Sequence, residues 1–469
     1  MKCLFHIAGV TLLTLATYSC KSIDIPTLPE MPEVPGTFLG STDMLSIGDI
    51  SWGVFFDDPY LTALIEEALA NNLDLLATVE RIEIARTQFQ IREGALYPTM
   101  DGIVRYRSGD IKSNVLNGSI NGDRNVTNRV ENNFIGFQSH WEIDLWGKLR
   151  NRRDAAYFRI LATEKGQQLV TTTLVAEVAR LYYDLLGFDM ELETIEKNME
   201  FQKMALELIK IQKMAGRATE LAVQQFSAQL LSTQSLRYKK RQEIIEAENA
   251  LDFLMGRFPE PIARAESLSD IRLPEVVNTG VPADLLLRRP DIQEAELKLL
   301  ASKLDVDAAR AEFFPSLNLT PYMGLNDRSI PAALQFPGSL TVGLLGGITS
   351  PILQRGRIRA GFDQSIAENK ISLYNYQQTI LRGFREVVTS LQRVDNLKNL
   401  YALKEEETQV LLKAVTTAND LFRGGYASYL EVITAQARAL EVELEMASTR
   451  KEVFQSVIDL YRSLGGGWN

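Results

Sequence analysis

An internal repeat constrains the fold of this chain more than any single motif does. A glycine-centred turn occurs twice, and its two copies, at Gly216 and Gly425, lie 209 residues apart. The same offset of 209 residues aligns Gly147, in Trp-Gly-Lys-Leu-Arg, with Gly356, in Arg-Gly-Arg-Ile-Arg. Two independent matches at one offset predict two structural repeats, each built as a helix, a strand pair, a long helix, a turn and a helix.

A third recurrence indicates where the two repeats differ in length. Pro98 and Pro315 each follow an aromatic residue, and they lie 217 residues apart rather than 209. The strand pair of the second repeat is therefore shorter, and we expect the difference to fall in its loop.

Helical spacing of apolar residues dominates most of each repeat. Many of the residues on these seams are Ala, Gly, Ser or Thr, which suits coiled-coil-like packing into closely packed walls, although ordinary bundle helices share the pattern. At 1.5 Å per residue the longest helix in each repeat would reach about 90–100 Å, and two shorter helices stacked end to end would match it. The expected helices are Glu67–Glu93, Asn151–Ala215, Arg217–Arg257, Asp284–Glu312, Ala360–Asp420 and Ser428–Ser463.

Four other segments alternate with a period of two. In Phe134–Leu145 apolar residues alternate with polar ones, which is typical of a strand with one lipid-facing and one wet face. The other expected strands are Thr99–Arg107, Leu317–Tyr322 and Leu340–Ile348. Four strands cannot close a barrel, and open edges are not tolerated in lipid, so the chain must oligomerise. Two copies would give eight strands and three would give twelve with an aqueous lumen; strand number alone leaves both open.

The N-terminus reads as a lipoprotein signal peptide. Lys2 precedes an apolar run from Ile7 to Ala16, and Ser19 stands before Cys20, which would become the acylated first residue of the mature chain. The alternative is an ordinary cleaved signal with a coincidental cysteine. The only other cysteine is Cys3, so no disulfide framework can hold the mature body. No later stretch approaches the ~20 consecutive apolar residues of a membrane helix.

Composition argues against two other classes of protein. The formal net charge is −10, whereas a protein that binds nucleic acid needs a basic surface. Of the two histidines only His140 remains after signal removal, so histidine-based catalytic triads and histidine-rich metal sites are unavailable. We expect no enzyme activity, no catalytic residues and no metal site.

One specific run of residues carries a family resemblance. It reads Gly-Val-Pro-Ala-Asp-Leu-Leu-Leu-Arg-Arg-Pro-Asp-Ile-Gln-Glu-Ala-Glu over 280–296, continued by Ala-Ala-Arg-Ala-Glu-Phe-Phe-Pro over 308–315. With Trp52, the Asp-Leu-Trp-Gly segment at 144–147 and the Leu-Gly-Gly-Gly-Trp segment at 464–468, it resembles the TolC-like outer membrane factors, and in particular the NodT-type lipoproteins of RND efflux systems. The resemblance runs from Cys20 to the last residue.

The resemblance implies a mainly α fold with β: a homotrimer with a long α-helical barrel in the periplasm, topped by a shared 12-stranded transmembrane β-barrel to which each chain gives four strands. It further implies a passive exit duct for small toxic solutes, drugs or metals, in the outer membrane, joined to a periplasmic adaptor and an inner-membrane RND transporter. The only attached group expected is lipid on Cys20, with no cofactor. Alternatives are a duct for type I protein secretion and a periplasmic coiled-coil scaffold.

The expected organisation of the chain follows from the repeat and the resemblance together. It comprises a signal peptide (1–19), an anchor and extended segment (20–60), a first repeat (61–257, with a β-hairpin at 99–145 and a tip near 216), an equatorial linker (258–283), a second repeat (284–463, with a β-hairpin at 316–350 and a tip near 425) and a C-terminal tail (464–469).

The resemblance also assigns site residues. The two tips should contact the adaptor through Gly216, Arg217, Ala218 and Leu221, and through Gly424, Gly425, Tyr426, Ala427, Ser428 and Leu430. In several members of that family acidic residues past the second tip line a closed aperture. Glu431 takes one such place, whereas Thr434 stands where others carry Asp. We therefore expect one ring of three Glu431 side chains, and the alternative is a plain surface role for Glu431. The run Arg288, Arg289, Pro290 and Asp291 looks structural, with Pro290 starting a helix, Asp284 capping one and the arginines held by carboxylates.

Overall fold

The computed structural model describes residues 27, 29, 35–38, 46–112, 127–268, 271, 280, 282–327 and 329–468. The expected signal peptide and Cys20 lie outside these residues. The described chain divides into two compact units. One contains residues 84–161 and 297–374, and the other contains the described parts of 31–83, 162–296 and 375–469.

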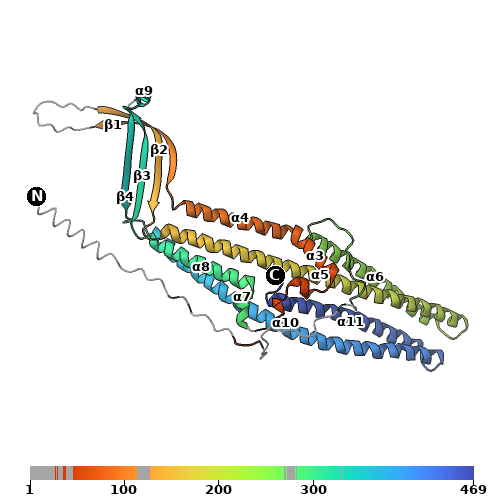
Figure 1. Ribbon diagram of the computed structural model, residues 1–469. Coiled ribbons are helices and arrows are strands. Elements are labelled where there is room, and N and C mark those ends of the chain that lie inside the picture. Colours follow the sequence, from red (N-terminus) through yellow and green to blue (C-terminus); the bar gives the residue numbers. More distant parts are fainter. Residues whose placement is uncertain are drawn as a thin grey trace, which may run out of the picture. The chain divides into compact units, whose positions relative to one another are not determined.

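The first unit carries one antiparallel sheet with the strand order β1-β2-β3-β4 (Figure 1). The four expected strands are confirmed, and they are longer than expected: β1 is Thr99–Lys112, β2 is Thr127–Ile143, β3 is Ser316–Asp327 and β4 is Leu340–Thr349. The second hairpin has strands of 12 and 10 residues against 14 and 17 in the first. The expectation that the loop takes up the length difference was therefore wrong, because the strands take up most of it.

The register gives this sheet one apolar face. Phe137 lies opposite Met323, and Met323 lies opposite Val342. Since directly opposed residues point to the same face, these three exposed side chains form one apolar row across three strands. On the other face the Arg105 guanidinium donates to Gln138 Oε1 at 3.3 Å. The alternation expected for β2 is therefore confirmed and extends over the sheet.

A short junction turns β2 into the long helix α5 (Lys148–Met214). The Asp144 carboxylate accepts from the backbone N–H groups of Leu149 and Arg150 at 3.2 and 2.9 Å, so it caps the start of the helix. Gly147 has φ +79°, a conformation that favours glycine. The indole of Trp146 stacks on Phe314 and donates to the carbonyl of Pro315 at 2.7 Å.

Two helical hairpins repeat one design with no length difference. The first consists of α5 and α6 (Glu220–Leu254), and the second of α10 (Arg357–Arg423) and α11 (Tyr429–Ser463) (Figure 1). The helices have 67 and 35 residues in both hairpins, so all four boundaries recur at the offset of 209 read from the sequence. At 1.5 Å per residue α5 and α10 are each about 100 Å long. The repeat expected from the glycines is confirmed.

Two expected helices are broken. The helix expected over Glu67–Glu93 is α3 (Pro59–Asn71) followed by α4 (Leu73–Gly94), with Asn72 extended between them. The Asn72 side chain accepts from Leu75 N at 3.0 Å and donates to Leu254 O at 2.8 Å, so it starts α4 and ties it to α6. The helix expected from Asp284 is broken at Arg289, which precedes a proline and is therefore extended.

The remaining described helices are short, apart from α8. They are η1 (Ile47–Asp49), α2 (Trp52–Phe55), η2 (Pro282–Asp284), α7 (Leu285–Arg288), α8 (Pro290–Ala311) and α9 (Ile330–Ala333). Pro290 starts α8 as expected. Asp284 stands at the N-cap position of α7 without a capping hydrogen bond, and its carboxylate instead lies 3.4 Å from the Arg288 guanidinium. The expected cap was therefore wrong.

Aromatic contacts fix the N-terminal segment in the second unit. The fully buried ring of Tyr461 stacks on Phe55 with centroids 4.0 Å apart, and its hydroxyl donates to Ile50 O at 2.7 Å. Tyr182 is also fully buried and donates to Asp58, whose other carboxylate oxygen caps α3.

Among the described residues, none of the helices combines the length and the apolar character that a membrane span requires.

Candidate functional site

The first tip is a turn between α5 and α6 in which glycine is required. Gly216 has φ +72°, and a Cβ there would be strained whatever the space around it. Arg217 N donates to Gln212 O at 2.8 Å, the long hydrogen bond of a Schellman turn. The hydroxyl of Thr219 then accepts from Ala222 N at 3.2 Å and starts α6. Leu221 is exposed just beyond the turn.

The second tip has the same construction. Gly425 has φ +77°, and Tyr426 N donates to Leu421 O at 2.9 Å. Ser428 caps α11, where Thr219 caps α6 in the first tip. The side chains of Tyr426 and Leu430 are exposed. Two solvent-facing turns of one shape, each with exposed apolar side chains, are suited to binding a partner.

A common core lies next to the two tips in the second unit. It draws residues from all four long helices, and Ala218 and Tyr429 of the tips pack against it. Its buried members are Leu206 and Ile209 of α5, Ala222 and Phe226 of α6, Ala418 of α10 and Val432 of α11. Of the expected tip residues Ala218 packs against this cluster, and the contact of the tips with an adaptor stays a prediction.

Glu431 has a local structural role that the sequence analysis did not anticipate. Its carboxylate accepts from the backbone N–H of Ser428 at 2.8 Å and from the Ser428 hydroxyl, which closes a capping box. These hydrogen bonds from Ser428 lower the pKa of Glu431, so its charge persists below the pH at which an ordinary glutamate is neutralised. Glu431 and Thr434 are both exposed. A ring of Glu431 side chains stays a prediction.

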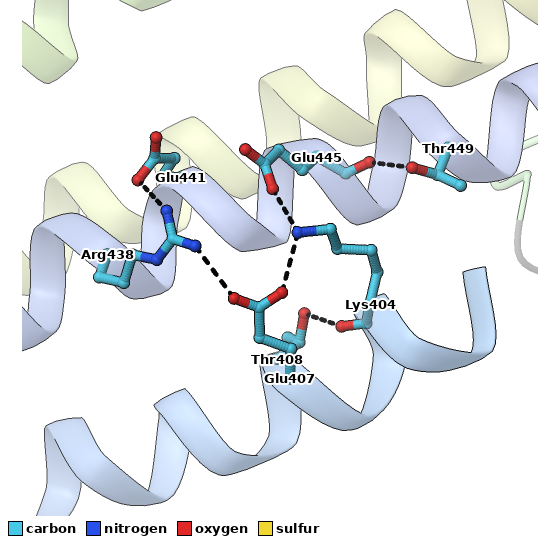
Figure 2. Close-up of polar contacts among 7 residues, drawn as sticks. All are labelled: Lys404, Glu407, Thr408, Arg438, Glu441, Glu445 and Thr449. Atoms are coloured by element: carbon cyan, nitrogen blue, oxygen red, sulfur yellow. Dashed lines mark hydrogen bonds and ion pairs between the residues drawn. The ribbon is translucent and has the colours of Figure 1, made fainter. Parts of the chain in front are cut away.

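A chain of alternating charges joins α10 to α11 (Figure 2). The Lys404 ammonium donates to Glu407 at 2.8 Å and to Glu445 at 2.7 Å. Arg438 in turn bridges Glu407 and Glu441 at 3.1 and 2.7 Å. Hydrogen bonding by Lys404 lowers the pKa of Glu407, so the cluster is ionised at neutral pH. We call these five residues the α10–α11 staple.

A cavity of about 660 Å³ lies among α5, α6, α10 and α11. Gln202 lines it, is 2% exposed, and has no hydrogen-bond partner within the described chain for either amide atom. Gln436 lines the same cavity with an unpartnered amide oxygen. Such a cavity is polar and roomy enough for water. No sequence signal indicated this cavity, because both glutamines stand in helical segments with an ordinary coiled-coil pattern.

Carboxylates bind both arginines of the Arg288–Asp291 segment, for which a structural role was expected. The Arg289 guanidinium lies 2.7 Å from Asp291 and 2.9 Å from Glu386, and it also donates to Ser463 O at 2.9 Å. Burial opposes the charge of Arg289, but hydrogen bonding and attraction from Asp291 and Glu386 outweigh it and raise its pKa. Arg288 lies 2.9 Å from Asp49. These contacts join α8 to α10, to the end of α11 and to the N-terminal segment, as a structural role requires.

Among the described residues no group of three or more His, Cys, Asp and Glu side chains is arranged to hold a metal ion.

Comparison with known proteins identifies the family. The family model described as outer membrane efflux protein matches residues 64–257 and 281–466. This chain belongs to the outer membrane efflux protein family. It is therefore an efflux channel of the outer membrane and not an enzyme, and the family expected from the sequence is confirmed.

Individual relatives match over nearly their whole length. The cation efflux system protein CusC of Escherichia coli O6:H1 is 30% identical over 422 residues, which are 89% of this chain and 88% of CusC. The solvent efflux pump outer membrane protein SrpC of Pseudomonas putida is 29% identical over 88% of this chain and 87% of SrpC. SilC of Salmonella typhimurium, described as a probable outer membrane lipoprotein, is 28% identical over 90% of this chain and 89% of SilC.

The fold agrees with a solved relative. A crystal structure of CusC matches with a TM-score of 0.82 at 27% identity, and it covers 96% of this chain and all of that one. The efflux protein is thus the outer-membrane channel of a tripartite pump, which implies a periplasmic adaptor and an inner-membrane transporter as partners. None of these relatives supports the alternative of type I protein secretion.

Proposed function

We propose that this efflux protein works as a homotrimeric, lipid-anchored exit duct whose three sheets join into one 12-stranded transmembrane β-barrel. The observation that carries the proposal is the sheet itself. Its order leaves β1 and β4 at the two edges, each paired to one strand within the described chain, and its apolar face is exposed. In lipid such edges have to be paired, and a second copy supplies β4 for β1.

Three copies suit a duct better than two. Eight strands enclose a space that side chains fill, whereas a larger barrel leaves an aqueous lumen. The polar face of the sheet, with Gln138, His140 and Tyr322, would then line that lumen, while the face with Phe137 and Val342 would meet lipid.

The anchor would be lipid on Cys20. Support comes from the Ser19-Cys20 sequence after an apolar run and from the description of SilC as a probable lipoprotein. Mass spectrometry of the mature N-terminal peptide tests this: a diacylated or triacylated Cys20 is expected, and a free N-terminus at another residue would contradict it.

The adaptor would bind at the six tips of the trimer. The repeated turns at Gly216 and Gly425 and the exposed side chains of Leu221, Tyr426 and Leu430 support this role. The inner-membrane transporter, which we expect to be of the RND class, would then supply the energy, and the duct itself would stay passive.

The cargo would be small toxic solutes. CusC is named for cations and SrpC for solvents, so relatives at nearly equal identity serve different cargo. That pattern supports a duct that accepts whatever its transporter delivers.

Mass determination on protein extracted from outer-membrane fractions tests the assembly. Multi-angle light scattering of the detergent complex should give three chains per particle. Two chains would instead support the eight-stranded alternative, and a single chain would contradict the proposed barrel.

A further inference from the structure

The cavity among the four long helices has a floor and a mouth. Its volume is about 660 Å³, and residues of α5, α6, α10 and α11 line it. On α11, Val432 and Ala439 line the cavity and are 2% and 4% exposed. Phe201 of α5 and Leu412 of α10 also line it and are 61% and 45% exposed. The cavity therefore has its floor on α11 and its mouth between α5 and α10.

Two glutamines place polar atoms without partners in this cavity. Gln202 of α5 is 2% exposed, and neither its Oε1 nor its Nε2 has a hydrogen-bond partner within the described chain. Gln436 of α11 adds a buried Oε1 that also lacks a partner there. Buried amide groups without partners cost free energy, so most of those in folded proteins are hydrogen-bonded. Gln202 and Gln436 therefore indicate an occupant that supplies both a donor and an acceptor.

The design of the helical hairpins does not itself require these glutamines. At the offset of 209 residues, Leu411 of α10 stands at the position of Gln202, and Ser227 of α6 stands at the position of Gln436. The two long helices have the same length, so a leucine serves at the equivalent place. What fills the cavity explains Gln202 better than the packing of its hairpin does.

Most of the lining around the glutamines is apolar. Ile209 and Phe226 line the cavity and are 1% and 3% exposed. Apolar walls, a few converging polar groups and a volume of about 300–1,000 Å³ are typical of a site for a small molecule. Water alone would satisfy the amides but would leave these walls in contact with water, which a bound apolar group avoids.

The charged side chains of the lining are paired or exposed. Lys197 forms an ion pair with a glutamate one turn earlier on α5, and Glu443 accepts from Asn198 at 2.9 Å. Asp420 and Arg423 are exposed at the tip end of the lining. A charged occupant beside the glutamines would lose its hydration without gaining a free counter-charge among the described residues. The chemistry of the lining therefore favours a neutral occupant.

We propose that this cavity is a binding site for small neutral molecules that carry an amide, or a similar donor beside an acceptor, on an apolar body. Gln202 pairs with the polar group through its carbonyl and its N–H, and Gln436 accepts from a further N–H. The apolar body lies against Ile209 and Phe226. The site lies within one chain, so it depends neither on the number of copies nor on the cargo of the duct. Its occupant contacts α5 and α11 together and ties the two hairpins to each other near the tips.

Titration calorimetry with benzamide tests the site on the full-length protein in detergent, with empty micelles as the blank. Acetophenone is the matched probe, because it has the same shape but carries a methyl group in place of the NH2 group. We expect saturable binding of benzamide and affinity for acetophenone that is weaker by about fivefold, since it cannot donate to the glutamines. No saturable binding of benzamide, or equal affinity for the two probes, would overturn the proposal.

A pair of variants assigns the binding to Gln202. Gln202→Leu introduces the residue type found at the equivalent position of the second repeat, and it should lower the affinity for benzamide by about tenfold because two hydrogen bonds are lost. Gln224→Leu, at an exposed position of α6 outside the cavity, is the matched control and should bind benzamide as the native protein does. Equal affinities of the two variants would show that Gln202 does not bind the ligand. The comparison of the two probes uses native protein and holds whatever Gln202→Leu does to folding.

Crystals soaked in 4-bromobenzamide provide an independent readout. An anomalous bromine peak inside the cavity, with the amide of the probe against Gln202, is the expected result. Ordered water on Gln202 and Gln436 without a bromine peak would make the cavity a hydration site only and would contradict the assigned ligand class.

Discussion

At the scale of single residues, buried polar groups hold the N-terminal segment against the helices. The Tyr182 hydroxyl donates to Asp58 at 2.6 Å and accepts from Ala265 N at 3.3 Å. Burial first, and the neighbouring Asp58 next, raise the pKa of Tyr182, so it remains a donor at every physiological pH. One hydroxyl therefore serves the cap of α3 and the segment that follows α6.

Removing that hydroxyl should destabilise the protein. Tyr182→Phe leaves Oδ2 of the Asp58 carboxylate without its donor, and an unsatisfied buried group costs about 1–3 kcal/mol. We expect the thermal unfolding midpoint of the trimer to fall by several degrees. Tyr60→Phe, on an exposed ring two residues from Asp58, is the control and should leave the midpoint unchanged; equal midpoints for the two variants would contradict this role.

Glycines at the tips and within the helices should respond in opposite ways to alanine. Gly425→Ala places a side chain at φ +77°, where the left-handed conformation costs about 1–2 kcal/mol. Gly361→Ala lies inside α10 with open space around the new Cβ, and it should stabilise by about 0.5–1 kcal/mol. Thermal unfolding of both variants distinguishes the two effects. A stabilising Gly425→Ala would show that the tip does not need glycine.

At the scale of elements, the α10–α11 staple holds two helices by charge. Hydrogen bonding from Lys404 lowers the pKa of Glu407, so this contribution to stability is present above the ordinary glutamate value of 4.5 and is lost as the pH falls through the lowered pKa. High salt should weaken it as well, because all of its members are at least partly exposed.

Deuterium exchange can follow the staple directly. Glu407→Gln removes the carboxylate that both Lys404 and Arg438 contact, so we expect faster exchange in peptides covering 398–412 and 432–446 at pH 7. Glu406→Gln, on the same helix outside the staple, is the control. If Glu407→Gln at pH 7 exchanges like native protein at pH 7, the staple does not hold these helices.

Elements that follow from periodicity were predictable, and elements set by side-chain chemistry were not. The two helical hairpins could be predicted because matching glycine turns at one offset indicate two hairpins of equal length. The break at Asn72 was missed because helical spacing continues across it, whereas a helix start at Pro290 was expected. The signals were present: Asn72 is a residue type that starts helices, and Arg289 precedes a proline.

The candidate site was predictable to a similar extent. The tip turns could be located from Gly216 and Gly425, since a left-handed turn between helices favours glycine. A serine at 428 followed by a glutamate at 431 is the pattern of a capping box. The capping role of Glu431 nevertheless became clear only once α11 was seen to begin there. The α10–α11 staple pairs residues more than 30 positions apart, which no local pattern reveals.

At the scale of the whole molecule, the repeat, the sheet and the family lead to one assembly. A sheet with two edges and an apolar face needs further copies in lipid, and two equal hairpins per chain suit a closed ring of helices.

The most direct measurement is single-channel conductance of the purified trimer in a planar bilayer, for the native protein and for Glu431→Gln. Glutamine can still accept from the backbone of Ser428, so this variant removes the charge while keeping the start of α11. We predict small, cation-selective channels for the native protein, with selectivity that persists below the usual pKa of glutamate because that of Glu431 is lowered. Glu431→Gln should conduct with reduced selectivity, whereas a trimer that does not conduct at all would contradict the account of this protein as an outer-membrane duct.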